Sequence, residues 1–223
     1  LASVRDFAAG LRQDGGRLDL LINNAGIMTT PYFQTEDGFE GQLAVNYLGH
    51  FLLTGLLLPA LEAAPAARVV TLYSLAHRLG GIRFEDMHFT RGYDAGKSYY
   101  QSKMACLMFA LELNQRLVHG GYTTRSTAAH PGISQSDLYR HMPKPLRLIT
   151  RLLGSWVLQP AEQGALSTLY AALSDDIGGG EAIGPGGAGQ RRGAPRMAEV
   201  EESALRQADR DRHQAAAGDV ELE

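Results

Sequence analysis

The segment 99–118, which is predicted to be a buried helix, begins with two residues that could together exchange protons with a bound alcohol or carbonyl. Tyr99 and Lys103 are four residues apart, so their side chains share one face of that helix. An ammonium beside a phenol favours the phenolate and lowers the pKa of the phenol. The pair could therefore act as a general acid/base near neutral pH, and the alternative is an exposed helical pair without a function.

Two further polar residues stand where chemistry could use them. Ser74 follows the apolar run 68–73, a predicted strand, so its hydroxyl could hydrogen-bond a substrate oxygen or could simply start a turn. Asn46 lies inside an otherwise apolar helical segment, where both its helix propensity and its burial are unfavourable. Asn46 therefore needs hydrogen-bond partners, and either a role at a site or a structural role would provide them.

The elements that position these residues follow from the hydrophobic patterning. Apolar runs predict strands at 18–23 and 68–73, and a third strand is predicted at 123–129, where His130-Pro-Gly132 closes it. Helical periodicity predicts helices at 3–11, 36–64, 99–118 and 160–173. Strands that alternate with helices predict βαβ units, hence an α/β fold with a doubly wound parallel sheet. Ligands of such sheets bind at the carboxyl ends of the strands, so we expect the chemistry just after each strand.

Composition excludes several classes of protein. The 223 residues carry 21 Lys and Arg against 24 Asp and Glu, a net charge of −3, which excludes a strongly basic nucleic-acid binder. The single cysteine, Cys106, cannot form an internal disulfide and favours a reducing compartment, so we expect a cytoplasmic location. The first residues do not resemble a signal peptide, and no transmembrane segment of about 20 uncharged apolar residues is expected. The seven histidines lack metal-ligand spacing, so no metal site is expected.

The C-terminal third changes character twice. The segment 142–158 mixes basic and apolar residues, which favours a substrate lid, a helix in contact with a membrane surface, or a surface helix packed on the core. From Gly178 the chain is Gly-rich and then charged, so we expect a domain at 1–177 and a tail of open order at 178–223. Residues 184–189 match the glycine spacing of a dinucleotide fingerprint, but without a preceding predicted strand they indicate a flexible loop.

Five short motifs in a fixed order resemble the short-chain dehydrogenase/reductase family, and more closely its retinol-dehydrogenase-like branch. The motifs are Asn23-Asn-Ala-Gly26, Asn46-Tyr-Leu-Gly-His-Phe51, Ser74-Leu-Ala-His77, Tyr99-Tyr-Gln-Ser-Lys103 and His130-Pro-Gly132. The long interval between Ser74 and Tyr99 also resembles that branch. The resemblance extends from Leu1 to about residue 172 and fades in the tail.

This resemblance implies a Rossmann-like NAD(P)-dependent oxidoreductase that transfers a hydride between a nicotinamide cofactor and an alcohol or carbonyl substrate. It implies that Tyr99 is the general acid/base and that Lys103 lowers the pKa of Tyr99 while binding the nicotinamide ribose. It also implies that Ser74 holds the substrate oxygen and that Asn46 supports a water that relays protons. The cofactor-binding residues that it implies are Asn24, Ala25, Gly26, Tyr99, Lys103, Pro131, Gly132, Ser134 and Ser136.

Substrate, cofactor type and assembly are less constrained. The apolar surroundings of Trp156 favour a hydrophobic small-molecule substrate. NAD and NADP both stay open, because the residues that choose between them normally follow the second strand of this fold, outside this chain. In this family the helices that correspond to 36–64 and 99–118 commonly pair between subunits, so the resemblance implies a homodimer.

One expected part of the family pattern is absent. The phosphate-binding glycine motif and the first strands should precede Leu1, so the resemblance implies an N-terminally truncated domain. Alone, the chain is expected to bind cofactor poorly and to expose the strand 18–23 as an apolar edge. The alternative is a non-catalytic truncated or decayed fragment, or an interaction domain, although the catalytic set of Asn46, Ser74, Tyr99 and Lys103 is present.

Overall fold

The computed structural model describes residues 1–13, 15–134 and 159–198. The predicted lid or membrane-surface helix at 142–158, Ser136 and the charged end of the tail lie outside these residues. The helices are α1 (Ala2–Gln13), α2 (Gly41–Leu43), α3 (Gly49–Glu62), α4 (Ala95–His119) and α6 (Ala161–Leu173). The strands are β1 (Leu20–Asn23), β2 (Arg68–Leu72), β3 (Arg125–Ala129), β4 (Ala182–Pro185) and β5 (Pro195–Met197).

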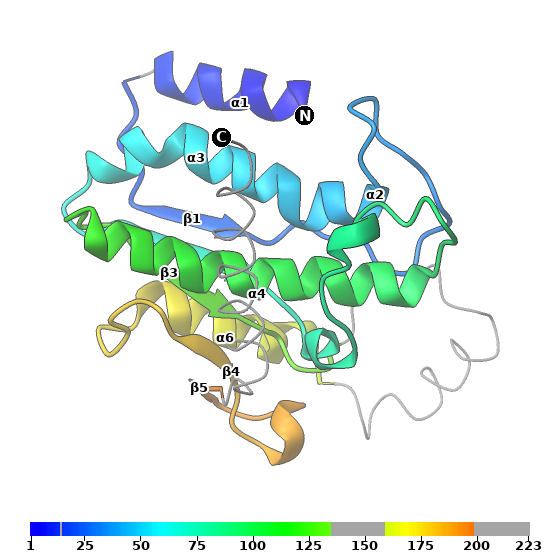
Figure 1. The fold of residues 1–223 in the computed structure, drawn as a ribbon. Coiled ribbons are helices and arrows are strands. Elements are labelled where there is room, and N and C mark those ends of the chain that lie inside the picture. Colours follow the sequence, from blue (N-terminus) through cyan, green and yellow to red (C-terminus); the bar gives the residue numbers. More distant parts are fainter. Residues whose placement is uncertain (14, 135–158, 199–223) are drawn as a thin grey trace.

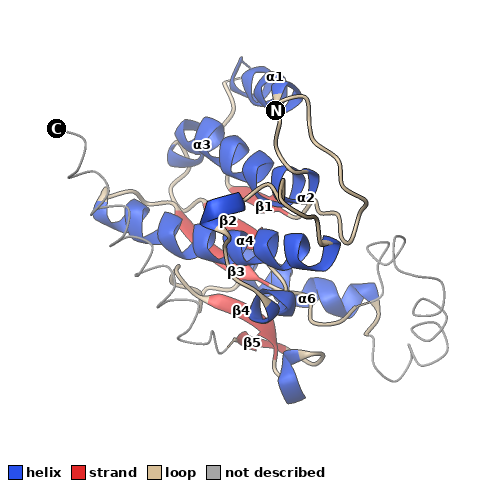
Figure 2. Cartoon of the chain, turned by 45° about the vertical axis from the view of Figure 1, so that its right-hand side comes forward, coloured by secondary structure: helices blue, strands red, loops and turns tan. Residues whose placement is uncertain are grey.

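One five-stranded sheet forms the centre of the molecule, with the strand order β1-β2-β3-β4-β5 (Figure 1). The first four strands run parallel, and β5 pairs antiparallel with β4. Each parallel connection carries a helix, as a right-handed crossover requires. The predicted α/β fold with a parallel, Rossmann-like sheet is confirmed (Figure 2).

The two faces of the sheet are covered by different helices because successive residues of a strand point to opposite sides. Ala128 of β3 packs against Leu107 of α4 on one face. The next residue, Ala129, packs on the other face in a cluster with Val70 of β2 and Ala171 of α6. Burial on both faces explains the consecutive apolar residues Val69 and Val70 of β2 and the small residues of β3, whose sequence is Arg-Ser-Thr-Ala-Ala.

The predicted helix at 36–64 begins later than expected and is not uniform. Residues 36–40 form a loop, and the Glu40 carboxylate caps α2 by accepting the N–H groups of Gln42 and Leu43. A π-helical turn, η1 (Ala44–Leu48), then joins α2 to α3. The sequence missed this start because the cap residue is a glutamate rather than the more usual serine, threonine, aspartate or asparagine.

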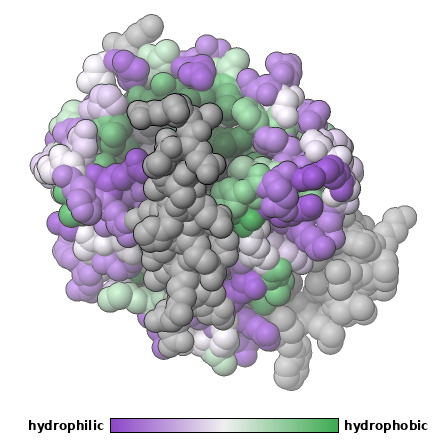
Figure 3. All heavy atoms as spheres, in the orientation of Figure 1, coloured by the Kyte–Doolittle hydropathy of each residue, from purple (hydrophilic) through white to green (hydrophobic). Residues whose placement is uncertain are grey.

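The stretch Gly41–Glu62 is long and apolar enough to cross a membrane by length and composition, whereas the sequence was expected to hold no such segment. A core helix can pass the same test, and Leu61 of α3 packs against Val69 of β2. Apolar side chains are nevertheless visible on the face that carries α3 and α4 (Figure 3). Phe51, for example, is 53% exposed there.

The Gly-rich segment after Gly178 differs from the flexible loop that we expected, because residues 182–185 form the buried strand β4. A Cβ added at Gly184 would collide with the imidazole of His130, so this glycine permits close packing between β4 and the end of β3. The sequence missed the strand because a glycine and a proline occupy two of its four positions.

Candidate active site

A cavity of about 600 Å³ lies where the parallel strands β1, β2 and β3 end, with α6 along one side. The predicted site residues that line it are Asn24, Gly26, Ser74, Tyr99, Lys103, Pro131, Gly132 and Ser134. Ala25 and Asn46 are not part of the lining that the described residues form. The carboxyl ends of three strands thus bring residues more than 100 positions apart in the sequence to one place, as expected for this sheet.

Tyr99 lies in the second turn of α4, and its side chain is 6% exposed. The helix begins at Ala95, four residues earlier than predicted, because the Asp94 carboxylate caps it by accepting the N–H of Lys97 at 2.9 Å. Burial raises the pKa of Tyr99 to about 12, and a hydrogen bond with the Ser74 side chain opposes that shift. Tyr99 is therefore protonated at neutral pH in this structure.

The raised pKa of Tyr99 differs from the lowered pKa that the sequence predicts from the neighbouring ammonium of Lys103. The Lys103 Nζ instead donates a hydrogen bond to the Leu72 carbonyl, at 3.0 Å. Burial of the phenol dominates, since a phenolate in this apolar surrounding would lose most of its hydration. Tyr99 and Lys103 do both line the cavity, as their i, i+4 spacing predicts.

Gly26, in the loop after β1, lies beside Lys103 and Asn46. A Cβ added at Gly26 would lie 3.6 Å from the Lys103 Nζ and 3.4 Å from the Asn46 Oδ1. Gly132, after β3, has a φ of +68°, and a Cβ there would collide with the Arg191 carbonyl. A side chain is therefore disfavoured at Gly132, whereas a Cβ at Gly26 would make only ordinary van der Waals contacts.

Ser74 is both a cavity residue and the start of a turn, so the two alternatives hold together. Its Oγ accepts the N–H of Ala76 at 3.2 Å at the start of the 3-10 turn η2 (Leu75–Leu79). Its carbonyl accepts hydrogen bonds from the backbone N–H of His77 at 3.0 Å and from the His77 Nδ1 at 2.7 Å. These contacts fix the serine at the end of β2.

Asn46 lies in the π-helical turn η1 and is fully buried. Its Oδ1 accepts the N–H of Ile27 at 2.8 Å, and its Nδ2 donates to the Ile27 carbonyl at 3.0 Å and to the Ser102 Oγ at 2.8 Å. The Cys106 thiol donates to the Asn46 backbone carbonyl at 3.0 Å. Asn46 thus has the hydrogen-bond partners that its burial requires, and these contacts place it behind the cavity wall.

His130 and His77 were singled out only as parts of motifs, and the structure buries both beside the site. The Tyr73 ring lies edge-on between them, with ring centroids 5.3 Å from His77 and 5.0 Å from His130. Burial lowers the pKa of His130 to about 4. The neutral His130 ring accepts the N–H of Gly132 at its Nδ1, at 3.1 Å, so it fixes the chain after β3.

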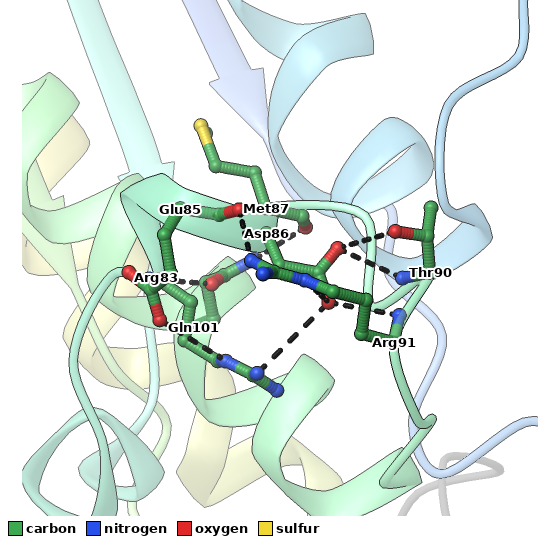
Figure 4. A network of polar contacts seen from close by, with 7 residues as sticks. All are labelled: Arg83, Glu85, Asp86, Met87, Thr90, Arg91 and Gln101. Atoms are coloured by element: carbon green, nitrogen blue, oxygen red, sulfur yellow. Dashed lines mark hydrogen bonds and ion pairs between the residues drawn. The ribbon is translucent and has the colours of Figure 1, made fainter.

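The loop between Ser74 and Tyr99 is organised by Asp86 (Figure 4). Its carboxylate accepts the N–H of Arg91 at 3.0 Å and both the N–H and the hydroxyl of Thr90 at 2.8 Å. The guanidinium groups of Arg83 and Arg91 each lie 3.9 Å from it. The Arg91 backbone bond, supported by the Thr90 bonds and by the Arg91 charge, lowers the pKa of Asp86 to about 2.

Gln101 ties this loop to α4. Its Oε1 accepts the N–H of Arg83 at 2.9 Å, and its Nε2 donates to the Met87 carbonyl at 2.8 Å. Gln101 lies between Tyr99 and Lys103 in the sequence, so the long loop is anchored on the helix that carries both of them.

The sequence missed the contribution of α6 to the site. Gly164, Thr168 and Leu169 line the cavity, and a Cβ at Gly164 would lie 2.9 Å from the Ser134 Cβ. The one sequence signal for this contact was Gly164 itself, because a glycine within a helix can permit another segment to approach closely. Within residues 1–13, 15–134 and 159–198 no group of three metal-ligating side chains is found. The polar groups that line the cavity include the Tyr99 phenol, the Lys103 ammonium and the Asn24 amide.

The family model described as short chain dehydrogenase matches residues 1–145. The mouse polyprenol dehydrogenase is 45% identical over 183 residues, which are 80% of this chain and 55% of that protein. The bovine retinol dehydrogenase 12 is 47% identical over 175 residues, which are 78% of this chain and 54% of that protein. The chain therefore spans about half the length of these relatives.

The solved structures agree with this match. A crystal structure of an uncharacterised protein from Mycobacterium paratuberculosis has a TM-score of 0.71 and 37% identity, over 94% of this chain and 70% of that chain. The Pseudomonas aeruginosa RhlG/NADP active-site complex has a TM-score of 0.59 and 24% identity, over 81% of this chain and 70% of that chain, which shows a shared fold. The chain belongs to the short-chain dehydrogenase/reductase family, in its retinol-dehydrogenase-like branch.

Proposed function

We propose that this chain carries the catalytic part of an NAD(P)-dependent oxidoreductase that interconverts an alcohol and a carbonyl compound. The observation that carries the proposal is the convergence of Tyr99, Ser74 and Lys103 on one cavity at the carboxyl ends of the strands. A phenol can donate or accept the proton that must move when the substrate carbon gains or loses a hydride.

The residues fit the nicotinamide and ribose part of such a cofactor. The Lys103 ammonium and the Asn24 amide line the cavity and suit the hydroxyl groups of a ribose. Gly26 and Gly132 line the same cavity and carry no side chains. When bound, the nicotinamide ring would supply or accept the hydride. Both NAD and NADP fit this half of the site.

The side chains of Tyr99 and Ser74 would both act on the substrate oxygen. In carbonyl reduction the Tyr99 hydroxyl donates its proton to the substrate oxygen, and the Ser74 hydroxyl hydrogen-bonds the same oxygen. In alcohol oxidation Tyr99 takes that proton back. Burial raises the pKa of Tyr99 to about 12, so the phenol is in the protonated form that carbonyl reduction needs. Asn46 supports the wall behind these groups rather than touching the substrate.

A hydrophobic substrate is part of the proposal. Leu72, Tyr73 and Leu169 give the cavity an apolar wall, beside the polar end at Tyr99. The names of the relatives refer to retinol and polyprenol, which are apolar alcohols. We therefore propose a hydrophobic alcohol, or the matching carbonyl compound, as the substrate.

An upstream segment is also part of the proposal. The outer edge of β1 is unpaired within the described sheet, and Ile22 on that strand is 37% exposed. A parallel strand with a glycine-rich turn would cover this edge and would bring a helix N-terminus to the cofactor phosphates. We propose that the longer protein supplies it from residues before Leu1.

The proposal also covers how the protein assembles and where it is located. Tyr47 of η1, Phe51 of α3 and Phe109 of α4 form an aromatic cluster, with ring centroids 5.5 to 6.1 Å apart. Such a cluster suits a partner helix pair, so we propose a homodimer formed through this face. The proposed compartment is the cytoplasm, on the ground that the chain has a single, buried cysteine, and contact with a membrane surface would be compatible with an apolar substrate.

A non-catalytic fragment or interaction domain is the second candidate, and the unpaired β1 edge favours it. Titration with NAD and NADP separates the two, using this chain and a longer protein that includes the upstream segment. The proposal expects micromolar binding by the longer protein and much weaker binding by this chain. Binding by neither form would favour the non-catalytic candidate, and equal binding by both would show that no upstream segment is needed.

A further inference from the structure

We propose that Ser102 is a positioning residue that holds Asn46, and through it the loop after β1, in register with the catalytic Tyr99. Ser102 lies on α4 and is fully buried, and it is not among the residues that line the cavity. The inference about structure stands on the hydrogen bonds alone, whereas its consequence for turnover rests on the proposed function.

The Ser102 hydroxyl joins two elements at once. Its Oγ accepts a hydrogen bond from the Asn46 Nδ2 at 2.8 Å and donates one to the Tyr99 carbonyl at 2.8 Å. The hydroxyl can donate only one bond, and that bond is directed back into the turn that carries the phenol. Ser102 therefore connects the π-helical turn η1 to the turn of α4 that presents Tyr99.

Asn46 transmits this connection to the loop after β1. Both N–H bonds of its amide are used, one to the Ser102 Oγ and the other to the Ile27 carbonyl, while its Oδ1 accepts the Ile27 N–H. Ile27 directly follows Gly26, which lines the cavity. The order Tyr99, Ser102, Asn46, Ile27 is thus a continuous path of hydrogen bonds from the proposed acid/base to the opposite rim, buried as far as Asn46 and half-buried at Ile27.

The α4 helix holds Asn46 at a second point. The Cys106 thiol, one turn after Ser102, donates to the Asn46 backbone carbonyl at 3.0 Å. This bond keeps the π-helical turn close to α4 when Ser102 is changed, so the loss of the Ser102 hydroxyl should free the Asn46 side chain without unfolding the helix. One buried Asn46 N–H would then lack a partner, and the amide would rotate to satisfy it.

Hydrogen exchange of the Ile27 amide tests the positioning role, because that N–H is bonded to the Asn46 Oδ1 at 2.8 Å. The variant Ser102→Ala is compared with Ser126→Ala. Ser126 is as buried as Ser102, but its hydroxyl makes no hydrogen bond within the described part of the chain. We expect the Ile27 amide to exchange about tenfold faster in Ser102→Ala only, as the loss of one hydrogen bond predicts. An equal rate in both variants would overturn the proposal.

Turnover by the longer protein gives the second measurement. Ser102→Ala should lower kcat about tenfold and leave the substrate KM within about twofold, because the hydroxyl aligns the reacting group and does not bind substrate. In an Asn46→Ala background the same change should lower kcat less than about twofold, since the partner is already lost. An undiminished effect in that background would contradict the path through Asn46.

The two failures can be told apart. If the longer protein lacks oxidoreductase activity altogether, the proposed function fails, and the Ile27 exchange rates still decide whether Ser102 positions Asn46. If activity is present and Ser102→Ala behaves like Ser126→Ala in both measurements, only the positioning role is wrong.

Discussion

The two sides of the cavity differ in how completely they are built. On the α4 side the groups of Asn46, Ser102 and Lys103 are held by hydrogen bonds of 2.8 to 3.0 Å to neighbouring elements. On the β1 side the outer strand edge is unpaired and Ile22 is 37% exposed. The side that would move a proton is therefore closed and preorganised, whereas the side that would receive the cofactor phosphates is open within the described chain.

Acid should destabilise the folded chain through two buried histidines, His50 of α3 and His130 after β3. Burial lowers the pKa of both His50 and His130 to about 4, from an ordinary value of 6.5. Between pH 6.5 and pH 4 these histidines bind protons in the unfolded chain but not in the folded chain. Their contribution to the free energy of unfolding is therefore fully present above pH 6.5 and is lost as the pH falls toward 4. Each histidine should contribute a slope of about 1.4 kcal/mol per pH unit, or about 3 kcal/mol over this interval.

Chemical unfolding followed from pH 7 to pH 4 measures this slope. His50→Gln should reduce this slope by the share of one histidine. A free energy of unfolding that is constant across the interval would mean that the imidazoles are not held neutral by burial.

A pair of register partners compares the two sides directly. Ile22 of β1 lies opposite Val70 of β2, and Val70 is fully buried under α6. Val70→Ala should lower the free energy of unfolding by about 2.5 kcal/mol, and Ile22→Ala by about 1 kcal/mol, although Ile22 loses more atoms. Denaturant unfolding of both variants provides the measurement, and an equal or larger loss for Ile22→Ala would show that the β1 side is closed.

The sequence predicted those parts of the fold that local patterning determines. The expected strands at 18–23, 68–73 and 123–129 correspond to β1, β2 and β3. The first two are apolar runs, whereas the third was indicated by threonines followed by the turn signal His130-Pro-Gly132. The strand β4 was missed because it forms through pairing with β3 and through the close contact of Gly184 with His130. Neither interaction is visible in a four-residue window.

In the candidate site, too, local patterns were predictive and contacts between separate elements were not. The spacing of Tyr99 and Lys103 and the place of Ser74 at a strand end were sufficient to bring them to one cavity. The pKa of Tyr99 could not be predicted, since it depends on how deeply the phenol is buried rather than on which charges are near it in the sequence. The partners of Asn46 were likewise hidden, because Ile27 and Ser102 come from separate elements.

Turnover by the longer protein with Tyr99 replaced by Phe tests the central claim most directly. Tyr99→Phe removes only the hydroxyl that would carry the proton, so we expect the rate to fall by a factor of about 10² to 10⁴. Tyr100→Phe is the matched control, because this neighbouring phenol does not line the cavity, and it should keep the parent rate. Equal turnover by the two variants would contradict the role of Tyr99 as the acid/base of this site.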